Sequence, residues 1–420
     1  MIKRKPWAVV IAIAILTMVP VIATFFLFPY QPTKPPQANE VGSTPEGIQE
    51  VMKANNQFAF KLYSELARRE SGNIFYSPYS IFSALAMTYE GAKGGTAAEM
   101  KVVFSFPESD VLRPNFAALY NRINEEAKGY ELRTGNALWI QKDYPFLEDY
   151  LKRVEGYYGG KATVLDFVAE TEKSQKTINA FIEEQTNNKI KDLIPPGYID
   201  EYTRLVLTNA IYFKGYWKTA FNESLTGEDD FWIAPNRSVK VQMMRMNPNE
   251  TTKFNYADIG DVQILELPYT GEKISMLIIL PKDLEATESL LSAERLDDYR
   301  SKMKEERLDE ICLPKFELET KYFMKESLSA LGMPSAFSEV ADFSGMTGKK
   351  DLFISEVIHQ AYVKVDEKGT EAAAATAVIM ELTAITEMKV FRADRPFIFI
   401  IQERETGNVL FMGRIIDPSA

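Results

Sequence analysis

The stretch from Val365 to Arg395 reads VDEKGTEAAAATAVIMELTAITEMKVFRADR, and it connects two runs of residues that are typical of strands. Connections longer than about 15 residues are uncommon in compact domains unless they are functional or disordered. Disorder is disfavoured because Ala, Val, Ile, Met and Leu dominate this stretch and proline is absent from it. The composition therefore predicts a long connection that has a function of its own.

A period of two divides the first half of this connection into two faces. One face holds only small or apolar residues besides threonine, whereas the other carries the charges of Glu371 and Glu381. This alternation is typical of a strand that buries one side. Four consecutive alanines favour a helix instead, so an Ala-rich surface helix is the alternative. A segment that is first exposed and later fits between strands needs small side chains and a flexible start such as Gly369. The small and apolar face consists of Thr370, Ala372, Ala374, Thr376, Val378, Met380 and Leu382.

The composition of the whole chain excludes several classes of function. Of its 420 residues, 46% are hydrophobic, which is enough for a large core in one large domain or two ordinary ones. The net charge of -11 makes nucleic acid an improbable partner. One cysteine, Cys312, and one histidine, His359, allow neither an intrachain disulfide nor a Cys/His zinc site. No nucleophile motif accompanies His359, so we expect no enzyme, no metal and no cofactor.

The N-terminus combines a basic cluster with an apolar segment. Lys3, Arg4 and Lys5 precede an uncharged run from Pro6 to Tyr30, which is long enough to cross a hydrocarbon core of about 30 Å. The basic cluster should stay in the cytoplasm, which places the rest of the chain outside the cell. We predict that residues 1–30 are a signal anchor, with residues 7–28 in the membrane. A signal peptide cleaved after Ala23 is the alternative, and the protein would then be secreted.

Residues 31–45 contain four prolines among small polar residues, which is typical of an extended linker. We expect one domain over residues 46–420, since no later change in composition and no internal repeat is visible. Helical periodicity runs from Glu46 to Arg69 and from Ile81 to Tyr89. Because helices come mainly early and strands mainly late, the fold class predicted is α+β. Strand patterns cover Leu205–Phe213, Val262–Leu267, Ser275–Leu280, Glu310–Leu318, Val357–Val365, Pro396–Gln402 and Val409–Ile416.

Several motifs resemble those of the serpin family, in the family's order, over about Glu46 to Pro418. No single motif is specific, but the combination is. Glu367 to Thr376 is similar to the proximal hinge of inhibitory serpins. The other matching segments are Asn73–Ile81 (NIFYSPYSI), Leu207–Trp217 (LTNAIYFKGYW), Ala341–Met346 (ADFSGM), Asp394–Phe399 (DRPFIF) and Leu410–Arg414 (LFMGR).

The resemblance implies a serpin fold with three β-sheets, eight to nine helices and an exposed reactive-centre loop near the C-terminus. A target serine protease would attack this loop and form a covalent acyl-enzyme complex. The cut loop would then insert into the largest sheet as a new strand, and this would trap the protease. The chain would act as a monomer.

The resemblance also implies roles for individual residues. His359 would bond to Asn209 in a shutter below the opening sheet, together with Asn73, Ser77 and Ser80. Trp217 would lie at the breach, where the loop first enters. The loop hinge would comprise Glu367, Gly369, Thr370, Ala372, Ala374 and Thr376. For Asn73, Ser77 and Ser80, turn formation and helix capping before Ile81 are the alternative roles.

The family's usual interval of 16 residues from Glu367 places the reactive bond between Thr383 and Ala384. Counting back from Pro396 moves it towards Ile385, and Leu382 is another candidate for the specificity residue. Thr383 would suit an elastase-like protease, whereas Leu382 would suit chymotrypsin-like or subtilisin-like enzymes. The competing function is that of a non-inhibitory serpin, which would be a binding, carrier or chaperone protein.

Overall fold

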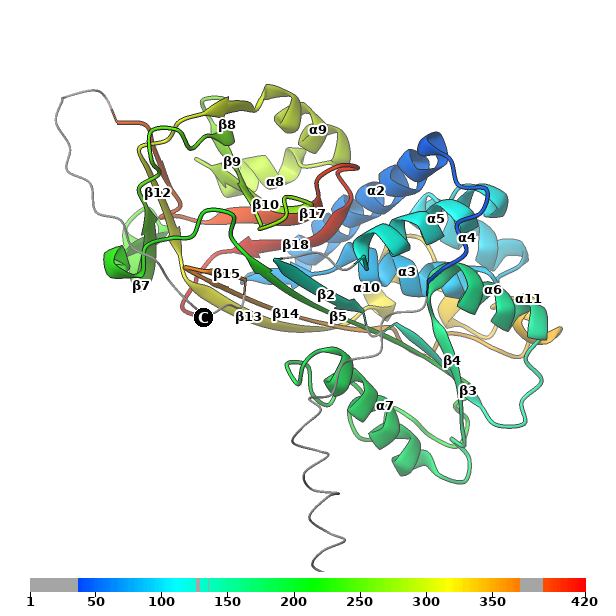
Figure 1. Cartoon of the computed structure of the whole chain (residues 1–420). Helices are drawn as coiled ribbons and strands as arrows, with labels where there is room; N and C mark the ends of the chain where they lie inside the picture. The colour runs from blue at the N-terminus through cyan, green and yellow to red at the C-terminus, as the bar shows by residue number, and fades with distance from the viewer. Residues whose placement is uncertain (1–36, 126–128, 135, 371–387) are drawn as a thin grey trace, which may run out of the picture. The chain divides into compact units, whose positions relative to one another are not determined.

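The computed structural model describes residues 37–125, 129–134, 136–370 and 388–420 (Figure 1). Within these ranges there are three β-sheets and ten α-helices, which confirms the α+β class. The helix count exceeds the eight or nine expected, and it includes the four-residue helix α11. The helices are α2 (Pro45–Arg69), α3 (Pro78–Tyr89), α4 (Gly94–Phe104), α5 (Ser109–Ile123), α6 (Glu148–Tyr158), α7 (Thr171–Gln185), α8 (Leu284–Leu290), α9 (Ala293–Lys302), α10 (Lys325–Leu331) and α11 (Ser344–Thr347).

The sheet that concerns function has the strand order β13-β14-β15-β5-β3-β4, with β2 also paired to β5. We call it the main sheet. Its centre is β5, which pairs on one side with β2 and β3 and on the other with β14 and β15. Its strands are β2 (Tyr130–Thr134), β3 (Ala137–Gln141), β4 (Lys161–Leu165), β5 (Leu205–Tyr216), β13 (Phe316–Phe323), β14 (Ile358–Asp366) and β15 (Gly369–Thr370).

Two further sheets complete the fold. The second sheet has the order β1-β18-β17-β10-β9-β8-β11, and the third has the order β16-β12-β7-β6. The second comprises β1 (Ile74–Tyr76), β8 (Phe254–Asp258), β9 (Val262–Pro268), β10 (Ile274–Pro281), β11 (Lys304–Glu306), β17 (Phe397–Glu403) and β18 (Val409–Ile415). The third comprises β6 (Gly227–Ala234), β7 (Arg237–Met246), β12 (Glu310–Pro314) and β16 (Val390–Arg392).

The two predicted helices each begin directly after a residue whose side chain caps the helix N-terminus. Thr44 caps α2 by accepting a hydrogen bond from the Gly47 amide at 3.0 Å. Ser77 caps α3 in the same way, through the Ser80 amide at 3.1 Å, so this helix begins three residues before the predicted Ile81. The run predicted from Glu310 to Leu318 is two strands, since β12 and β13 belong to different sheets and separate at Lys315.

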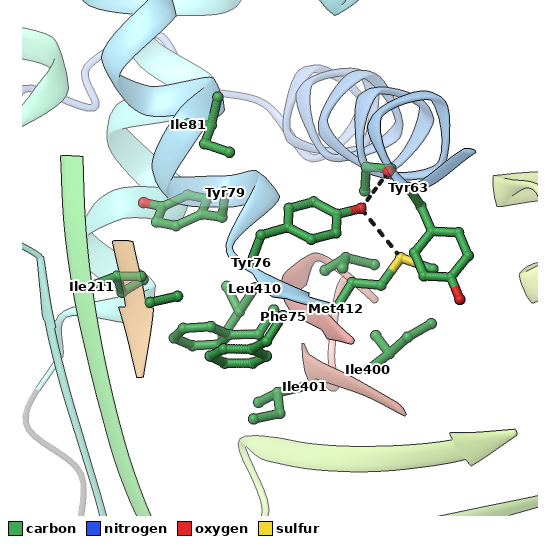
Figure 2. Close-up of a cluster of buried hydrophobic side chains, with 14 of the residues drawn as sticks. Tyr63, Phe75, Tyr76, Tyr79, Ile81, Ile211, Ile400, Ile401, Leu410 and Met412 are labelled. Atoms are coloured by element: carbon green, nitrogen blue, oxygen red, sulfur yellow. Dashed lines mark hydrogen bonds between the residues drawn. The ribbon is translucent and has the colours of Figure 1, made fainter. Parts of the chain in front are cut away.

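The core lies between the main sheet, the second sheet and the helices α2 and α3. Figure 2 shows Tyr76 pointing into it, with its hydroxyl donating to the Ala59 carbonyl at 2.6 Å. Phe75 stacks on Phe411 with ring centroids 5.5 Å apart. A second, smaller cluster joins α7 and the chain after it to the other face of the main sheet (Figure 1). The main sheet is therefore covered on both faces.

Candidate functional site

The candidate site is the place in the main sheet where strands β14 and β5 lie next to each other, and the predicted hinge enters the sheet there. Over Ile358–Tyr362, β14 pairs directly with β5 in parallel, opposite Thr208–Tyr212. At the C-terminal ends of these two strands, β15 lies between them and runs antiparallel to both. Thr370 is opposite Val365 of β14 and Gly215 of β5. We call the boundary between β14 and β5 the slot. The first two residues of an additional strand already occupy its upper end.

The predicted hinge residues Gly369 and Thr370 fit the slot closely. A Cβ on Gly369 would lie 1.9 Å from the Gly215 carbonyl oxygen, and its φ of +154° is one that side chains disfavour. Thr370 is fully buried, and its hydroxyl lies 2.8 Å from the hydroxyl of Tyr269. Position 369 therefore accommodates only glycine, and position 370 accommodates only a small side chain.

Trp217 holds the turn that leads into β15, at the place predicted for the breach. Its amide donates to the Lys368 carbonyl at 2.8 Å, and its indole N–H donates to the Asp366 carbonyl at 3.0 Å. Its ring stacks on Tyr269 with centroids 4.5 Å apart. Glu367 forms an ion pair with Lys315 at 3.0 Å, and its carbonyl accepts from the Phe221 amide. The entrance to the slot is thus held by both backbone and side-chain contacts.

His359 and Asn209 face each other across the directly paired part of the slot. The Ser77 amide donates to Nε2 of His359 at 3.0 Å, so the proton lies on Nδ1 and is donated to Oδ1 of Asn209 at 2.6 Å. Complete burial lowers the pKa of His359 to about 3. The imidazole is therefore neutral at physiological pH and forms a hydrogen bond between β14 and β5.

The network continues below these two strands. The amide of Asn209 donates to Oγ of Ser80 at 2.7 Å and to Oδ1 of Asn136 at 3.1 Å. Ser77 Oγ donates to the Leu410 carbonyl at 2.6 Å while it caps α3. Ser77 is thus both the N-cap of α3 and a member of this network, and Ser80, whose amide Ser77 caps, joins the network through its hydroxyl. Sequence reasoning missed Asn136 and Tyr269, because no motif singles them out.

Asn73 lies apart from the other predicted shutter residues. Its Oδ1 accepts from the amides of Ile416 and Asp417, and its Nδ2 donates to the Asp417 carbonyl at 2.6 Å. These three bonds tie the beginning of β1 to the C-terminal segment. Asn73 therefore does not join the His359 network, although it is only four residues from Ser77, because the extended backbone of β1 separates the two.

The C-terminal side of the long connection is anchored in the third sheet. In β16, Val390–Arg392 runs parallel to Glu310–Cys312 of β12. The Arg392 guanidinium donates to the carboxylate of Asp229, which also binds Arg245. Cys312 is fully buried, and burial raises the pKa of its thiol to about 11.

Several predicted residues fall outside the described ranges. They are the hinge residues Ala372, Ala374 and Thr376, the reactive-bond residues Leu382, Thr383 and Ala384, and the N-terminal segment 1–30 with the linker residues 31–36. Over the ranges that are described, no helix combines the length and apolar character needed to cross a bilayer. In the same ranges, no three His, Cys, Asp or Glu side chains are grouped as metal ligands would be.

Comparison with known proteins identifies the family to which the fold belongs. Residues 53–418 match the family described as serpin (serine protease inhibitor). An uncharacterized serpin-like protein of Thermococcus kodakarensis is 44% identical over 375 residues, which cover 88% of this chain and 86% of the relative. Human serpin B3 is 39% identical over 88% of this chain and 99% of its own length. The structure of human thyroxine-binding globulin superposes with a TM-score of 0.79 at 31% identity, over 89% of this chain and 99% of that one. The chain belongs to the serpin family.

Proposed function

We propose that this protein is a suicide inhibitor of serine-type proteases, and that it acts by inserting its own cleaved loop into the slot. One observation carries the proposal: β15 already lies between β14 and β5, and it runs antiparallel to both. Any continuation of β15 in the same register must separate β14 from β5 below Tyr362. The loop would then become a new central strand of the main sheet.

The register specifies which residues would meet, because each step along the loop is one step back along β14 and β5. Ala372 would come level with Val363 and Phe213, and Ala374 with Ala361 and Ile211. These positions face the core on the same side as Thr370, where space is limited. The small side chains of the hinge suit this face.

Thr376 is the one polar residue that follows Thr370 on the core-facing side. The same count brings it level with His359 and Asn209. Insertion would draw these two apart and break their 2.6 Å hydrogen bond. A threonine hydroxyl can both donate and accept, so it can satisfy groups that would otherwise be buried without a partner.

The charged residues of the loop match the other face. Glu371 would come level with Lys364 and Lys214, and Glu381 with Arg204. Each acidic side chain would thus enter beside a basic one. Agreement on both faces, in a single register, supports insertion over an Ala-rich surface helix.

The chemistry belongs to the protease in this proposal. Its serine oxygen attacks the carbonyl carbon of the scissile bond, which lies among Leu382, Thr383 and Ala384. The amine of the following residue then leaves with the proton that the protease's own base supplies, and an ester joins the loop to the protease. Insertion carries this ester to the far end of the slot before water hydrolyses it. The inhibitor contributes no catalytic group, since its one histidine is buried and both ring nitrogens are bonded.

The candidate residues of the scissile bond indicate the class of target. Thr383 suits elastase-like proteases, and Leu382 suits chymotrypsin-like and subtilisin-like enzymes. Lys389 is the first basic residue after Lys368, so trypsin-like targets are not favoured.

A carrier or chaperone serpin is the competing proposal, and the similarity to thyroxine-binding globulin is the observation in its favour. The hinge argues against it, because a protein that never inserts its loop does not need the close fit of Gly369 and Thr370. To separate the two, we would incubate the full chain with elastase-like, chymotrypsin-like and subtilisin-like proteases. A complex that survives boiling in detergent supports inhibition, whereas cleavage without a complex supports the carrier.

Replacing Thr370 tests the insertion step directly. Thr370→Arg would force a charged side chain into a fully buried site, so it should convert the inhibitor into a substrate that is cut and released. Thr370→Ser keeps the hydroxyl near Tyr269 and serves as the control. Inhibition by Thr370→Arg with an undiminished yield of complex would contradict the proposal.

We further propose that residues 7–28 anchor the protein in the cell membrane with the serpin domain outside, or else direct its secretion. The basic cluster before an uncharged segment supports this topology. Extraction of a cell-surface fraction with alkaline carbonate tests it. An anchored protein stays with the membranes, a secreted one appears in the medium, and a protein found only inside cells contradicts both.

A further inference from the structure

A short segment at the start of the described chain joins the helices α5 and α6. We call residues 37–44, which precede α2, the N-terminal arm (Figure 1). Ala38 is 4% exposed, and both of its backbone groups bond to the side chain of Asn121 in α5, the amide at 2.8 Å and the carbonyl at 2.9 Å. The Asn39 amide donates to the carbonyl of Gly156 in α6 at 2.6 Å. The arm therefore spans the two helices.

Two more bonds hold the arm on α5. The side-chain amide of Asn121 also donates to the carboxylate of Glu40 at 2.9 Å. The amide of Thr44 donates to Oδ1 of Asn115 at 2.8 Å, while the Thr44 hydroxyl caps α2. The arm is thus fixed near both of its ends, and the Asn121 side chain alone makes three of its bonds.

The two helices that the arm joins are attached to different sheets. After α6 ends at Tyr158, two glycines lead directly into β4, the edge strand of the main sheet. In contrast, α5 packs against α2, which contacts β18 of the second sheet. Arg122 of α5 also forms an ion pair at 3.0 Å with Glu405, which lies between β17 and β18. Through these helices, the arm links the main sheet to the second sheet.

Insertion of a strand would change the distance that this link spans. Neighbouring strands lie about 4.8 Å apart, so a strand between β14 and β5 would shift β5, β3 and β4 by about that distance relative to β14. Because α6 is joined to β4, it would move with this half of the sheet, whereas α5 would stay with the second sheet. Hydrogen bonds of 2.6 to 2.9 Å do not survive a shift of that size, so the arm would have to release one of the helices.

We propose that the N-terminal arm restrains the main sheet against insertion, because it joins α5 to α6 and so keeps the slot closed while the loop is uncut. This inference rests on the proposed function and adds to it a restraint that lies away from the loop and its hinge. The restraint raises the free energy of separating β14 from β5, so it slows insertion of the uncut loop and prolongs the life of the active inhibitor. Cleavage frees the loop from β16, and the gain from a complete inserted strand then exceeds the few bonds of the arm.

Asn121→Ala should speed the spontaneous loss of inhibition, because it removes three bonds of the arm and leaves the loop, the slot and the length of the chain unchanged. When the uncut protein is incubated at raised temperature, inhibition should decay roughly three- to tenfold faster than in the wild type. Asn39→Ala is the matched control, since the Asn39 side chain bonds within the arm, to the Val41 amide at 3.1 Å. A rate within about twofold of this control overturns the proposal.

The stability of the cleaved protein separates a restraint on insertion from an ordinary contact. Asn121→Ala should lower the melting temperature of the uncut protein by about 2 °C or more, but that of the cleaved protein by less than about 1 °C, because insertion has already altered the bonds of the arm. Differential scanning calorimetry of the two forms measures the difference. Equal lowering in both forms would mean that the arm only stabilises the fold, and it would overturn the proposal.

A synthetic peptide with the sequence of residues 370–382 tests the opening of the slot without a protease. The wild type should take up this peptide, and Asn121→Ala should do so roughly three- to tenfold faster. If the wild type traps a protease but Asn121→Ala takes up the peptide no faster, only the restraint fails. If the wild type takes up the peptide and traps no protease, the proposed function fails, and the two uptake rates still decide whether the arm restrains the sheet. If the wild type does neither, both fail together.

Discussion

His359 is the chain's one histidine, a residue type that ordinarily gains a proton just below neutral pH, and its surroundings in the folded protein keep it neutral. The Ser77 amide donates to Nε2 of His359, and Asn209 accepts from Nδ1. A second proton on the ring would have to bind at Nε2, where it would meet a hydrogen-bond donor instead of an acceptor. This arrangement makes the stability of the uncleaved protein depend on pH in a way that a single substitution can test.

The uncleaved protein should lose stability as the pH falls below about 6.5. The unfolded chain binds a proton on His359 with an ordinary pKa of about 6.5, whereas burial lowers the folded pKa to about 3. The neutral imidazole therefore makes its full contribution to the free energy of unfolding above pH 6.5, and this contribution is lost progressively down to about pH 3. Between pH 7 and 5 the loss should be about 2 kcal/mol. Guanidinium unfolding measures it, and His359→Gln should remove this pH dependence. If the free energy of unfolding changed equally with pH in the wild type and in His359→Gln, this would contradict the assignment of the pH dependence to His359.

Thr376 gives a second test at the scale of a residue. Thr376→Val should destabilise the cleaved protein by about 1 kcal/mol, because His359 and Asn209 would lose the hydroxyl that replaces their mutual bond. The uncleaved protein should be unaffected. Thermal melting of both forms measures the difference, and Thr376→Ser is the control that keeps the hydroxyl. A variant whose cleaved form melts like the wild type would show that the register is different.

At this scale the sequence was informative where a motif existed. The bond between His359 and Asn209 follows the resemblance to the family. Tyr269 and Asn136 could not be predicted, because their contacts join segments that are distant in the chain: Tyr269 meets Thr370 from 101 residues away. Asn73 and Ser77 are close in the sequence but bind different partners: Asn73 bonds to the C-terminal segment, whereas Ser77 caps α3.

At the scale of elements, the short strands β15 and β16 hold the two ends of the long connection. β15 lies in the slot, and β16 is paired with β12 and tied to Asp229 through Arg392. The eight residues from Leu382 to Val390 span at most about 28 Å, which is less than the roughly 40 Å that an inserted loop needs. An uncut loop can therefore insert fully only if β16 leaves the third sheet.

Arg392→Gln should accordingly speed the spontaneous loss of inhibition. The partly exposed ion pair with Asp229 contributes about 1 kcal/mol or less, so the rate of inactivation should rise by a factor of up to about five. Residual inhibition after incubation at raised temperature measures the effect. Arg237→Gln, at an exposed residue of β7 in the same sheet, is the control. If the two variants inactivate at equal rates, β16 does not limit insertion.

The longer elements were predictable from the sequence, and the short ones were not. The period of α2 and the apolar runs of β17 and β18 mark these elements clearly. By contrast, the two-residue β15 depends on its neighbours in the sheet, and the division between β12 and β13 depends on their joining different sheets. Local pattern carries no information about either.

At the scale of the whole molecule, the proposed insertion would give the protein two states of different stability. The uncleaved protein leaves β14 and β5 paired directly over only part of their length. An inserted strand would add hydrogen bonds to both of them and bury the apolar face of the loop. Three sheets could be expected from the family, whereas the position of β15 within the slot could not, since no motif encodes it.

Cleavage of the loop should therefore make the protein more resistant to heat. With about a dozen residues joining the sheet, the melting temperature should rise by about 10 °C or more. Differential scanning calorimetry before and after limited proteolysis near Leu382 measures the rise. The Thr370→Arg variant, cut in the same way, should show little increase. If the wild type also shows none, the loop does not insert.

The isolation of Cys312 has a practical consequence. Because the chain's one sulfhydryl is sealed inside the third sheet, a cysteine engineered elsewhere would be the sole target for a maleimide dye. One fluorophore on Thr203, next to Arg204 at the start of β5, and another on a protease would then test the proposed insertion by energy transfer, because an acylated protease should move towards Thr203 as the loop inserts.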